Sequence, residues 1–366
     1  MVNICIWGTS CKKVGDEAQM LSVCQILKST NSKLRLTIFA RHGEIIQSQH
    51  PEVETMPTAQ LFKTLGKLVK SDLFVIVGGP FMESTSQIIS CSLLVMAAKI
   101  FRVPVISFGT TVLPYMTPWG KFCYQKVFNG IQEITVREKV SYEILEKLNI
   151  RTPISLYGDP RYVLQPSNPD ETSDILRQNE INIDKPIVGI TLRHMHSQIP
   201  EWVKRSHGYT DDHVENAYDI IGQTVDRLSE YAQVVVLPMH PNHEDDVKAT
   251  QKIQKHMKNP ANLKVLSRSL RAPELMGIIR ECEMLIACRL ASAIFSTATG
   301  TPTVGIAYEP RLIDHMSQIG FEGCVTDWRE LDGQFIKKAI DTWSSRETMG
   351  KKMEAISFES IASAWK

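Results

Sequence analysis

No apolar run in this sequence approaches the roughly 20 residues that a helix needs to cross a membrane. The longest apolar stretches lie near residues 93–100 and 74–77, lengths that suit core helices and strands. The amino terminus, MVNICIWGTSCKK, turns polar after Trp7, whereas a signal peptide has a longer apolar centre. We therefore expect a cytoplasmic protein.

An excess of charge of one sign is also lacking, because 41 lysines and arginines stand against 40 aspartates and glutamates and the net charge is +1. This balance gives no electrostatic reason to expect a nucleic acid partner. The eight cysteines include no CxxC pair, and several lie in apolar segments, where cysteine acts as a small hydrophobe. We expect no structural zinc, no other metal site and a reducing compartment.

What the sequence does contain is a regular alternation of β-rich runs with helical patterns. In the first half the β-rich runs are 2–8, 34–40, 71–79, 103–110, 133–138 and 154–160. In the second half they are 185–193, 232–240, 263–268, 282–288 and 301–308. Continuous apolar strands in this order are typical of doubly wound parallel sheets. We predict an α/β protein with two Rossmann-like domains that face one another across a cleft.

A polar stretch between residues 160 and 185, with LQPSNPDETSD inside it, marks the expected domain boundary. We place a first Rossmann-like domain at residues 1–165, a second at 180–345 and a helical tail at 346–366. In open parallel sheets a ligand binds beyond the carboxyl ends of the strands. The polar residues that directly follow the expected strands are therefore the candidate site residues.

Arg289 directly follows the apolar run CEMLIAC, at the start of the expected helix ASAIFSTATG. A helix start already favours an anion, because unpaired N–H groups and the positive end of the helix dipole lie there. A guanidinium adds to that field and can hold a phosphate or a carboxylate through two parallel hydrogen bonds. The alternative is a salt bridge between Arg289 and a carboxylate from a neighbouring loop.

Other polar residues in the second half also follow expected strands. Arg193 ends the run GITLR, and Arg311 follows the run TPTVGIAY. His240 ends the run VVVLPMH, where a histidine is able either to exchange a proton near neutral pH or to cap a loop. His194 and His196 stand two residues apart, but no further residue at metal-ligand spacing completes a metal site.

In the first half, two glycine turns follow expected strands. The turn GTSCKKVGDE lacks the GxGxxG spacing of a dinucleotide site, and VIVGG permits close approach of the backbone to a ligand. A plain strand-to-helix turn explains each segment as well as a ligand site does. Arg137 follows the strand EITV, where an ion pair with the adjacent Glu138 competes with a ligand contact.

In their order along the chain, these segments resemble the polysaccharide pyruvyl transferase family. The matching segments are GDEA, SDLFVIVGG, VPVISFGTTVLP, ITVREKVSYEILEKLNI, YGDP, GITLR, LPMH and the block from Glu274 to Arg311. The similarity runs from about residue 4 to residue 323. It implies a two-domain GT-B-like fold and transfer of the enolpyruvyl unit of phosphoenolpyruvate onto a pair of sugar hydroxyls, with no cofactor.

The departures from the family's motifs concern the site itself. Arg289 matches the arginine of the family's RLH motif, but Ala291 stands where the family has histidine, and alanine cannot transfer a proton. Two explanations remain open: this substitution inactivates an otherwise active enzyme, or the chain is a natural member with altered or lost chemistry. Arg311 replaces the lysine of a YDPK-type motif, which keeps the charge but changes its geometry. Lys13 replaces an asparagine and Pro80 a third glycine.

The candidates and the resemblance together give a hypothesis for the site. The expected donor-binding residues are Arg193, Arg289, Arg311 and Ser292. The expected catalytic positions are Arg289, His240 and the position of Ala291. The expected acceptor-binding residues are Gly15, Asp16, Glu17, Gly78, Gly79 and Arg137. The acceptor would be a sugar or a lipid-linked glycan in exopolysaccharide or cell-wall synthesis, and a lipid-linked one would bring the protein transiently to the inner face of the membrane.

Two other functions fit the same sequence. One is a GT-B-type glycosyltransferase, which would bind a nucleotide sugar instead of phosphoenolpyruvate. The other is a non-catalytic relative that binds a glycan or an anion. This relative would be stabilised by its ligand and would show no turnover, even with histidine at position 291.

Overall fold

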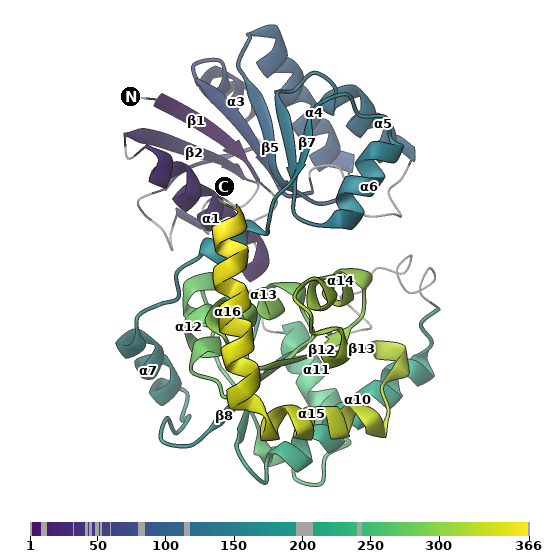
Figure 1. Ribbon diagram of the computed structural model, residues 1–366. Helices are drawn as coiled ribbons and strands as arrows, with labels where there is room; N and C mark the ends of the chain where they lie inside the picture. Colours follow the sequence, from purple (N-terminus) through teal and green to yellow (C-terminus); the bar gives the residue numbers. More distant parts are fainter. Residues whose placement is uncertain are drawn as a thin grey trace. The chain divides into compact units, whose positions relative to one another are not determined.

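The chain forms two compact units in a computed structural model (Figure 1). Unit 1 comprises Met1–Leu164 with Ser363–Lys366, and unit 2 comprises Gln165–Ala362. The structure describes residues 2–8, 13–31, 33–40, 43, 46–47, 51, 53–58, 60–79, 85–112, 118–194, 208–239 and 244–364. Each unit has one parallel sheet with helices on both faces.

Unit 1 is built on a seven-stranded sheet in the order β3-β2-β1-β4-β5-β6-β7, with every neighbouring pair parallel. Its strands are β1 (Val2–Trp7), β2 (Leu34–Ala40), β3 (Glu54–Pro57), β4 (Leu73–Val77), β5 (Val105–Thr110), β6 (Glu133–Val136) and β7 (Ile154–Leu156). Its helices are α1 (Val14–Thr30), α3 (Leu61–Leu68), α4 (Thr85–Ile100), α5 (Pro118–Cys123), the π-helix η1 (Tyr124–Phe128), α6 (Lys139–Lys147) and the 3₁₀-helix η2 (Pro160–Val163).

Both faces of this sheet are buried, which explains why its central strands are apolar along their whole length. On one face, Met20 and Val23 of α1 pack against Ile6 and Ile38. On the other face, residues of α4, α5, η1 and α6 pack against strand residues that include Phe74. The two faces therefore carry two separate apolar cores.

Unit 2 is built on a six-stranded sheet in the order β10-β9-β8-β11-β12-β13, again with only parallel pairs. Its strands are β8 (Ile187–Thr191), β9 (Gln233–Val236), β10 (Leu263–Val265), β11 (Met284–Ala287), β12 (Thr303–Ala307) and β13 (Val325–Asp327). Its α-helices are α7 (Pro169–Gln178), α10 (Asp211–Leu228), α11 (Glu244–Gln254), α12 (Ala272–Arg280), α13 (Leu290–Thr299), α14 (Pro310–Gln318), α15 (Gly333–Ser344) and α16 (Arg346–Ala364). Its short 3₁₀-helices are η3 (Pro260–Asn262), η4 (Glu322–Cys324) and η5 (Trp328–Glu330).

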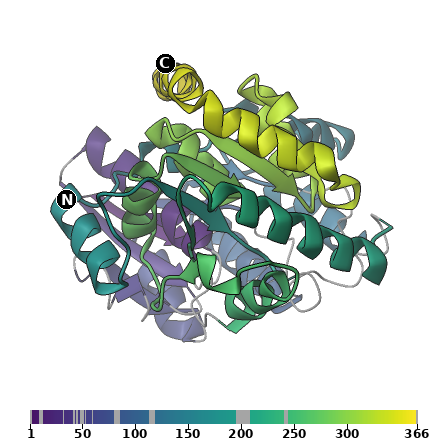
Figure 2. The ribbon, with the colours of Figure 1, turned by 90° about the horizontal axis from the view of Figure 1, so that it is seen from below.

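The apolar core on one face of this sheet is formed by α10, α11 and α15. Figure 2 shows the yellow-green helix α15 beside the green-teal helix α10, and the two pack together. At this core, the ring of Tyr218 meets that of Trp328 edge-on at a centroid distance of 5.8 Å. On the other side α12 packs against α13, and Gly300 ends α13 with φ of 73°, a backbone conformation that favours glycine.

The structure confirms the two expected Rossmann-like parallel sheets. Some elements were not indicated by the sequence pattern, among them the edge strands β3 and β13, whose residues are only partly buried. The polar segment 160–185 contains the helix α7, which begins after Asn168 because the side chain of Asn168 accepts a hydrogen bond from the N–H of Glu171. Residues 346–366, which we predicted to form a helical tail, include the helix α16, and this helix belongs to unit 2 up to Ala362.

All four strands at the sheet edges are short. The strands β3, β7, β10 and β13 have four, three, three and three residues. At β13, the Nζ atom of Lys338 donates to the carbonyl oxygen of Val325 at 3.1 Å and to the hydroxyl of Thr326 at 2.7 Å. Helix α15 therefore ties down the edge strand of unit 2.

Candidate functional site

Three arginines of unit 2 lie at the carboxyl ends of neighbouring strands. Arg193 follows β8, Arg289 follows β11, and Arg311 lies in the first turn of α14, which follows β12. The strands β8, β11 and β12 are neighbours in the sheet, so the three arginines lie along the edge where open parallel sheets bind ligands. We call these three residues, with the carboxylates of Asp246 and Glu309, the arginine cluster.

Arg193 and Arg311 are joined through Tyr308 and Glu309. The Nη1 atom of Arg193 donates to the hydroxyl of Tyr308 at 2.6 Å, and the guanidinium stands over the Tyr308 ring, 4.3 Å from its centroid. That hydroxyl donates to Glu309 Oε1 at 3.0 Å, and Arg311 Nη2 donates to the same oxygen. One carboxylate oxygen therefore orients both the tyrosine and a second arginine.

Arg289 is held in a buried ion pair. Its Nη2 donates to Asp246 Oδ1 at 2.7 Å, and its Nε donates to the carbonyl oxygen of Leu192 at 2.8 Å. The other oxygen of Asp246 accepts a hydrogen bond from the N–H of Met239 at 2.9 Å. The side chains of Arg289 and Asp246 are only 10% and 1% exposed. The sequence left two alternatives open for Arg289, and the structure shows the salt bridge. The guanidinium of Arg289 is therefore already paired with a carboxylate.

The pKa values in the cluster reflect burial and the charges of the neighbouring groups. Burial lowers the pKa of Arg193. Tyr308 and Glu309 raise it and Arg289 and Arg311 lower it, and the net direction is downward. Burial and the charge of Glu309 raise the pKa of Tyr308 to about 12. Burial raises the pKa of Glu309, but Arg311 and Arg193 lower it by more, so its net direction is downward. Among the described residues, the cluster thus brings three guanidinium groups and two carboxylates together, and their charges shift one another's pKa values.

The start of α13 lies directly after Arg289, and no side-chain hydrogen bond caps it among the described residues. Ala291 is in its first turn and is largely buried, so the position where the family has histidine lies next to the arginine cluster. Ser292 is completely buried, and its hydroxyl bonds to the hydroxyl of Thr191 at 2.7 Å and to the carbonyl oxygen of Arg289 at 2.8 Å. The hydroxyl of Ser292 is therefore engaged in holding this turn, and the donor contact expected of Ser292 stays a prediction.

His240, expected as a catalytic residue, lies outside the described residues, as do His196 and Pro80. Asp246 and Glu309, which the sequence did not single out as partners of the arginines, complete the cluster. A signal for Glu309 was present, because it stands two residues before Arg311 in the segment YEPR. Asp246 is 43 residues from Arg289 in the sequence, and only the tertiary fold brings the two together.

The acceptor-side candidates of unit 1 lie at the carboxyl edge of its own sheet. Gly15, Asp16 and Glu17 form the first turn of α1, where Glu17 is buried. Gly78 follows β4 with φ of 83°, a conformation that favours glycine, and Gly79 is half-buried beside it. The N–H of Gly78 donates to the carbonyl oxygen of residue 108 at 3.4 Å, so this turn is part of the sheet's hydrogen bonding.

Arg137 takes part in a buried ion-pair network. Its Nε donates to Glu138 at 2.9 Å, its Nη1 lies 3.4 Å from Asp159, and its side chain is 7% exposed. Asp159 also binds Arg161 at 2.6 Å. Burial raises the pKa of Asp159, but the two arginines lower it by more, so it lies well below its usual range. The structure therefore shows the ion pair with Glu138 that the sequence offered as an alternative, and the acceptor contact expected of Arg137 stays a prediction.

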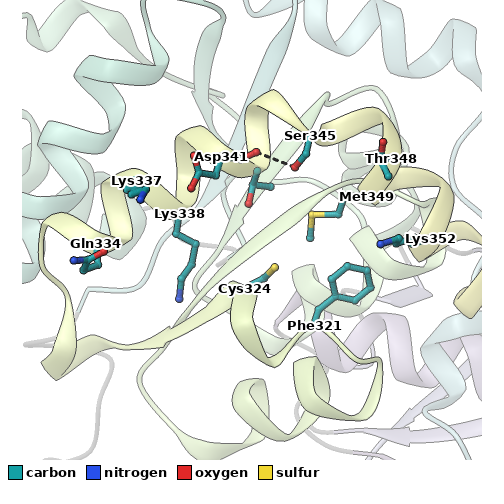
Figure 3. Close-up of a pocket in the computed structure, with 11 residues that line it drawn as sticks. Phe321, Cys324, Gln334, Lys337, Lys338, Asp341, Ser345, Thr348, Met349 and Lys352 are labelled. Carbon is teal, nitrogen blue, oxygen red and sulfur yellow. Dashed lines mark hydrogen bonds between the residues drawn. The ribbon is translucent and has the colours of Figure 1, made fainter.

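A pocket of about 550 Å³ lies elsewhere in unit 2 (Figure 3). It is lined by Phe321, Cys324, Gln334, Lys337, Lys338, Asp341, Thr342, Ser345, Thr348, Met349 and Lys352. Cys324 precedes β13, and Arg346 at the start of α16 binds Glu283, which precedes β11, at 3.0 Å. This end of the pocket therefore lies toward the amino ends of the strands. Since parallel sheets bind ligands at the opposite edge, we place the candidate site at the arginine cluster.

Within the described residues, no group of three or more histidine, cysteine, aspartate or glutamate side chains is arranged to hold a metal ion. None of the helices described is both long enough and apolar enough to cross a membrane.

Solved structures with the same fold come from several sugar-handling proteins. HepE of Anabaena, in complex with UDP-glucose, is 15% identical with a TM-score of 0.64, and the match covers 100% of this chain and 98% of HepE. MnaA of S. aureus, in a co-structure with UDP, is 14% identical with a TM-score of 0.60, covering 97% and 91%. The ADP-heptose lps heptosyltransferase II of E. coli is 16% identical with a TM-score of 0.55, covering 95% and 100%. These matches confirm the GT-B-like fold class.

Sequence comparison is more specific. The amylovoran biosynthesis protein AmsJ of Erwinia amylovora is 29% identical over 283 residues, which are 74% of this chain and span 65% of AmsJ. The family model of polysaccharide pyruvyl transferases matches residues 14–310. This match runs from the first residue of α1 to the first residue of α14 and includes Arg193, Arg289 and Ala291. The chain therefore belongs to the polysaccharide pyruvyl transferase family.

Proposed function

We propose that the protein transfers the pyruvyl group of phosphoenolpyruvate to two hydroxyls of a sugar in an exopolysaccharide precursor. The products are a pyruvate ketal and inorganic phosphate. Family membership supports a transferase of this kind, and the similarity to AmsJ supports a role in exopolysaccharide synthesis. The observation that carries the choice of donor is the arginine cluster, which gathers three guanidinium groups at the edge of the sheet where open parallel sheets bind ligands.

Phosphoenolpyruvate carries a carboxylate and a phosphate, so it needs two anion contacts. The side chain of Arg311 is 25% exposed, against 10% for Arg289, and Arg193 is linked to Arg311 through Tyr308 and Glu309. We assign these two arginines to the anionic groups of the donor, assisted by the start of α13. Arg289 acts as a positioning residue, because Asp246 and the carbonyl of Leu192 fix its guanidinium.

The reaction requires a proton at carbon and a nucleophile at the neighbouring carbon. A general acid protonates the methylene carbon of the donor, and the resulting cationic carbon is attacked by one sugar hydroxyl. The phosphate leaves with the bridging oxygen, and the second hydroxyl closes the ketal. Of the two protons that the hydroxyls lose, one replaces the proton given to the methylene carbon and the other ends on the departing phosphate. The sugar is assigned to the carboxyl edge of unit 1, where Gly15, Asp16, Gly78 and Gly79 remain the proposed acceptor contacts.

Alanine at position 291 leaves the general acid to another residue. We keep His240 for this role as a proposal from the sequence. A positioned acid or base is typically worth about 10²- to 10⁴-fold in rate, so a chain with alanine at this position should turn over slowly. Restoring histidine tests this directly, because Ala291 lies in the first turn of α13 beside the arginine cluster.

Turnover is tested by phosphate release from phosphoenolpyruvate in the presence of candidate sugar acceptors. Ala291→His should raise turnover by about 10²-fold or more. Ala298→His, in the last turn of the same helix, is the matched control and should change nothing. Equal rates of phosphate release for the parent chain and Ala291→His would refute the hypothesis that position 291 lacks a catalytic acid. Donor binding without phosphate release in both would favour a non-catalytic, anion-binding relative.

Donor identity is tested by thermal stabilisation, since a ligand that binds only the folded state raises the unfolding temperature. Phosphoenolpyruvate should stabilise the protein, and Arg311→Ala and Arg193→Ala should abolish this stabilisation. Arg177→Ala is the matched control, because Arg177 forms only an exposed ion pair with Asp174. Stabilisation by UDP-glucose instead of phosphoenolpyruvate would overturn the proposal in favour of a nucleotide-sugar glycosyltransferase.

A further inference from the structure

Helix α4 of unit 1 exposes a continuous apolar stripe. Ile89, Leu93, Met96 and Ile100 are 46%, 45%, 55% and 73% exposed. Their spacing of four, three and four residues places them on one side of the helix. The opposite side of α4, which includes Leu94, packs into the core of unit 1. An exposed stripe of this kind on a helix that already buries its other side indicates an interaction surface.

The stripe continues onto α5. Phe101, directly after α4, is 60% exposed, and Trp119 and Phe122 of α5 are 50% and 46% exposed. The rings of Trp119 and Phe122 stack at a centroid distance of 5.5 Å. Helices α4 and α5 lie side by side (Figure 1), and Lys99 Nζ ties the end of α4 to η1 by donating to the carbonyl oxygens of Val127 and Asn129 at 2.8 Å.

We call these seven apolar residues and the basic residues at their border the α4–α5 face. The seven are Ile89, Leu93, Met96, Ile100, Phe101, Trp119 and Phe122, and the basic residues are Arg102, Lys121 and Lys126. All three basic residues are exposed, and Lys126 Nζ lies 5.9 Å from the centroid of the Phe122 ring. Seven of the thirteen large hydrophobic side chains exposed in the described part of the chain belong to this face.

The segment that carries the face has an excess of positive charge. Residues 60–132 contain seven lysines and arginines and two acidic residues, although the whole chain has a net charge of only +1. One of the seven, Lys67, pairs with Glu54, and Lys99 binds backbone carbonyls. The other five are the three basic residues of the face together with Lys63 and Lys70, which are exposed. An apolar surface with a tryptophan, bordered by cations, matches the interface of a membrane with anionic headgroups.

We propose that the α4–α5 face binds the surface of a membrane that contains anionic lipids. The apolar residues would enter the headgroup boundary, and Arg102, Lys121 and Lys126 would contact the headgroups. Charge argues against a second copy of the chain as the occupant, because a two-fold interface would bring the same cations of both copies together. The binding does not require phosphoenolpyruvate or turnover, so it stands or falls separately from the proposed reaction.

The experiment is flotation of the full chain with vesicles of phosphatidylcholine, with and without phosphatidylglycerol. The protein should bind the anionic vesicles, and added salt should weaken the binding. Leu93→Glu with Phe122→Glu, and separately Lys121→Glu with Lys126→Glu, should each lower the vesicle partition coefficient by about tenfold or more. Ile183→Glu and Lys255→Glu, at exposed positions of unit 2, are the matched controls and should bind as the parent chain does.

Three results would overturn the proposal. The first is an absence of binding to anionic vesicles by the folded parent chain. The second is an equal loss of binding in the unit 2 controls, which would show that overall charge is responsible. The third is the finding that the parent chain does not bind vesicles but forms a dimer in sedimentation equilibrium, and that Leu93→Glu dissociates this dimer. That finding would assign the face to contacts between copies of the chain. Circular dichroism equal to that of the parent chain shows that the variants are folded, which we expect because all six changed side chains are exposed.

Discussion

The ion pair between Arg289 and Asp246 should stabilise unit 2 strongly, and the substitution Arg289→Met tests this. Methionine keeps most of the apolar length of the side chain but leaves the carboxylate of Asp246, which is 1% exposed, without its cation. Breaking a buried pair from one side costs about 3–5 kcal/mol. The N–H of Met239 continues to donate to Asp246, so we take the lower end, about 3 kcal/mol. A domain of this size loses roughly 2–4 °C per kcal/mol, which gives a fall of roughly 6–12 °C.

The assay is thermal unfolding followed by tryptophan fluorescence, since Trp328 lies in the core of unit 2. The double variant Arg289→Met/Asp246→Asn removes both charges and should recover at least half of the loss. Arg177→Met is the matched control, because the exposed Arg177–Asp174 pair should be worth at most about 1 kcal/mol. An unfolding temperature of Arg289→Met equal to that of the control would refute the structural role of the pair. So would a double variant no more stable than the single one.

Three further predictions concern unit 2. Ser292→Ala should lower the free energy of unfolding by about 1–3 kcal/mol, because the buried hydroxyl of Thr191 loses its partner, and should leave the affinity for phosphoenolpyruvate unchanged in calorimetry. Gly277→Ala should cost about 1–3 kcal/mol in denaturant unfolding, because the added methyl group would collide with the bonded hydroxyls of Ser167 and Thr172. Glu309→Gln should unfold below the parent chain at neutral pH, with a difference that shrinks in acid. The pKa of Glu309 is lower in the folded state than in the unfolded state. The stability that its carboxylate contributes is therefore present above the unfolded pKa of about 4.3 and is lost as the pH falls through the folded-state pKa. A constant difference between the two proteins down to acid pH would contradict this last expectation.

The sequence indicated the central strands and the edge at which the arginines lie, because both depend on local patterns. A run such as CEMLIAC is buried on both faces in a parallel sheet, and the residue after it necessarily lies at the carboxyl edge. The strand order, which makes β8, β11 and β12 neighbours, follows from the regular winding of such sheets. The placement of Arg193, Arg289 and Arg311 along one edge was therefore accessible before the structure.

The partners of these arginines were not accessible in the same way. Asp246 belongs to α11, and its pairing with Arg289 depends on how that helix packs beyond β9. Glu309 was overlooked although it stands close to Arg311 in the sequence. The sequence pattern alone does not show that the side chain of Glu309 points toward the arginines at the edge of the sheet. Helix α7 had a readable signal, Asn168 followed by a proline, but the polar composition of its segment favoured a linker.

The four short edge strands have a consequence for how the protein behaves at high concentration. A sheet grows between molecules when a long edge offers a row of backbone groups to a foreign strand. Here β3, β7, β10 and β13 offer at most four residues each, and at β13 the ammonium group of Lys338 already occupies a backbone carbonyl. Both sheets are thereby protected against intermolecular strand addition and the fibrous aggregates to which it leads.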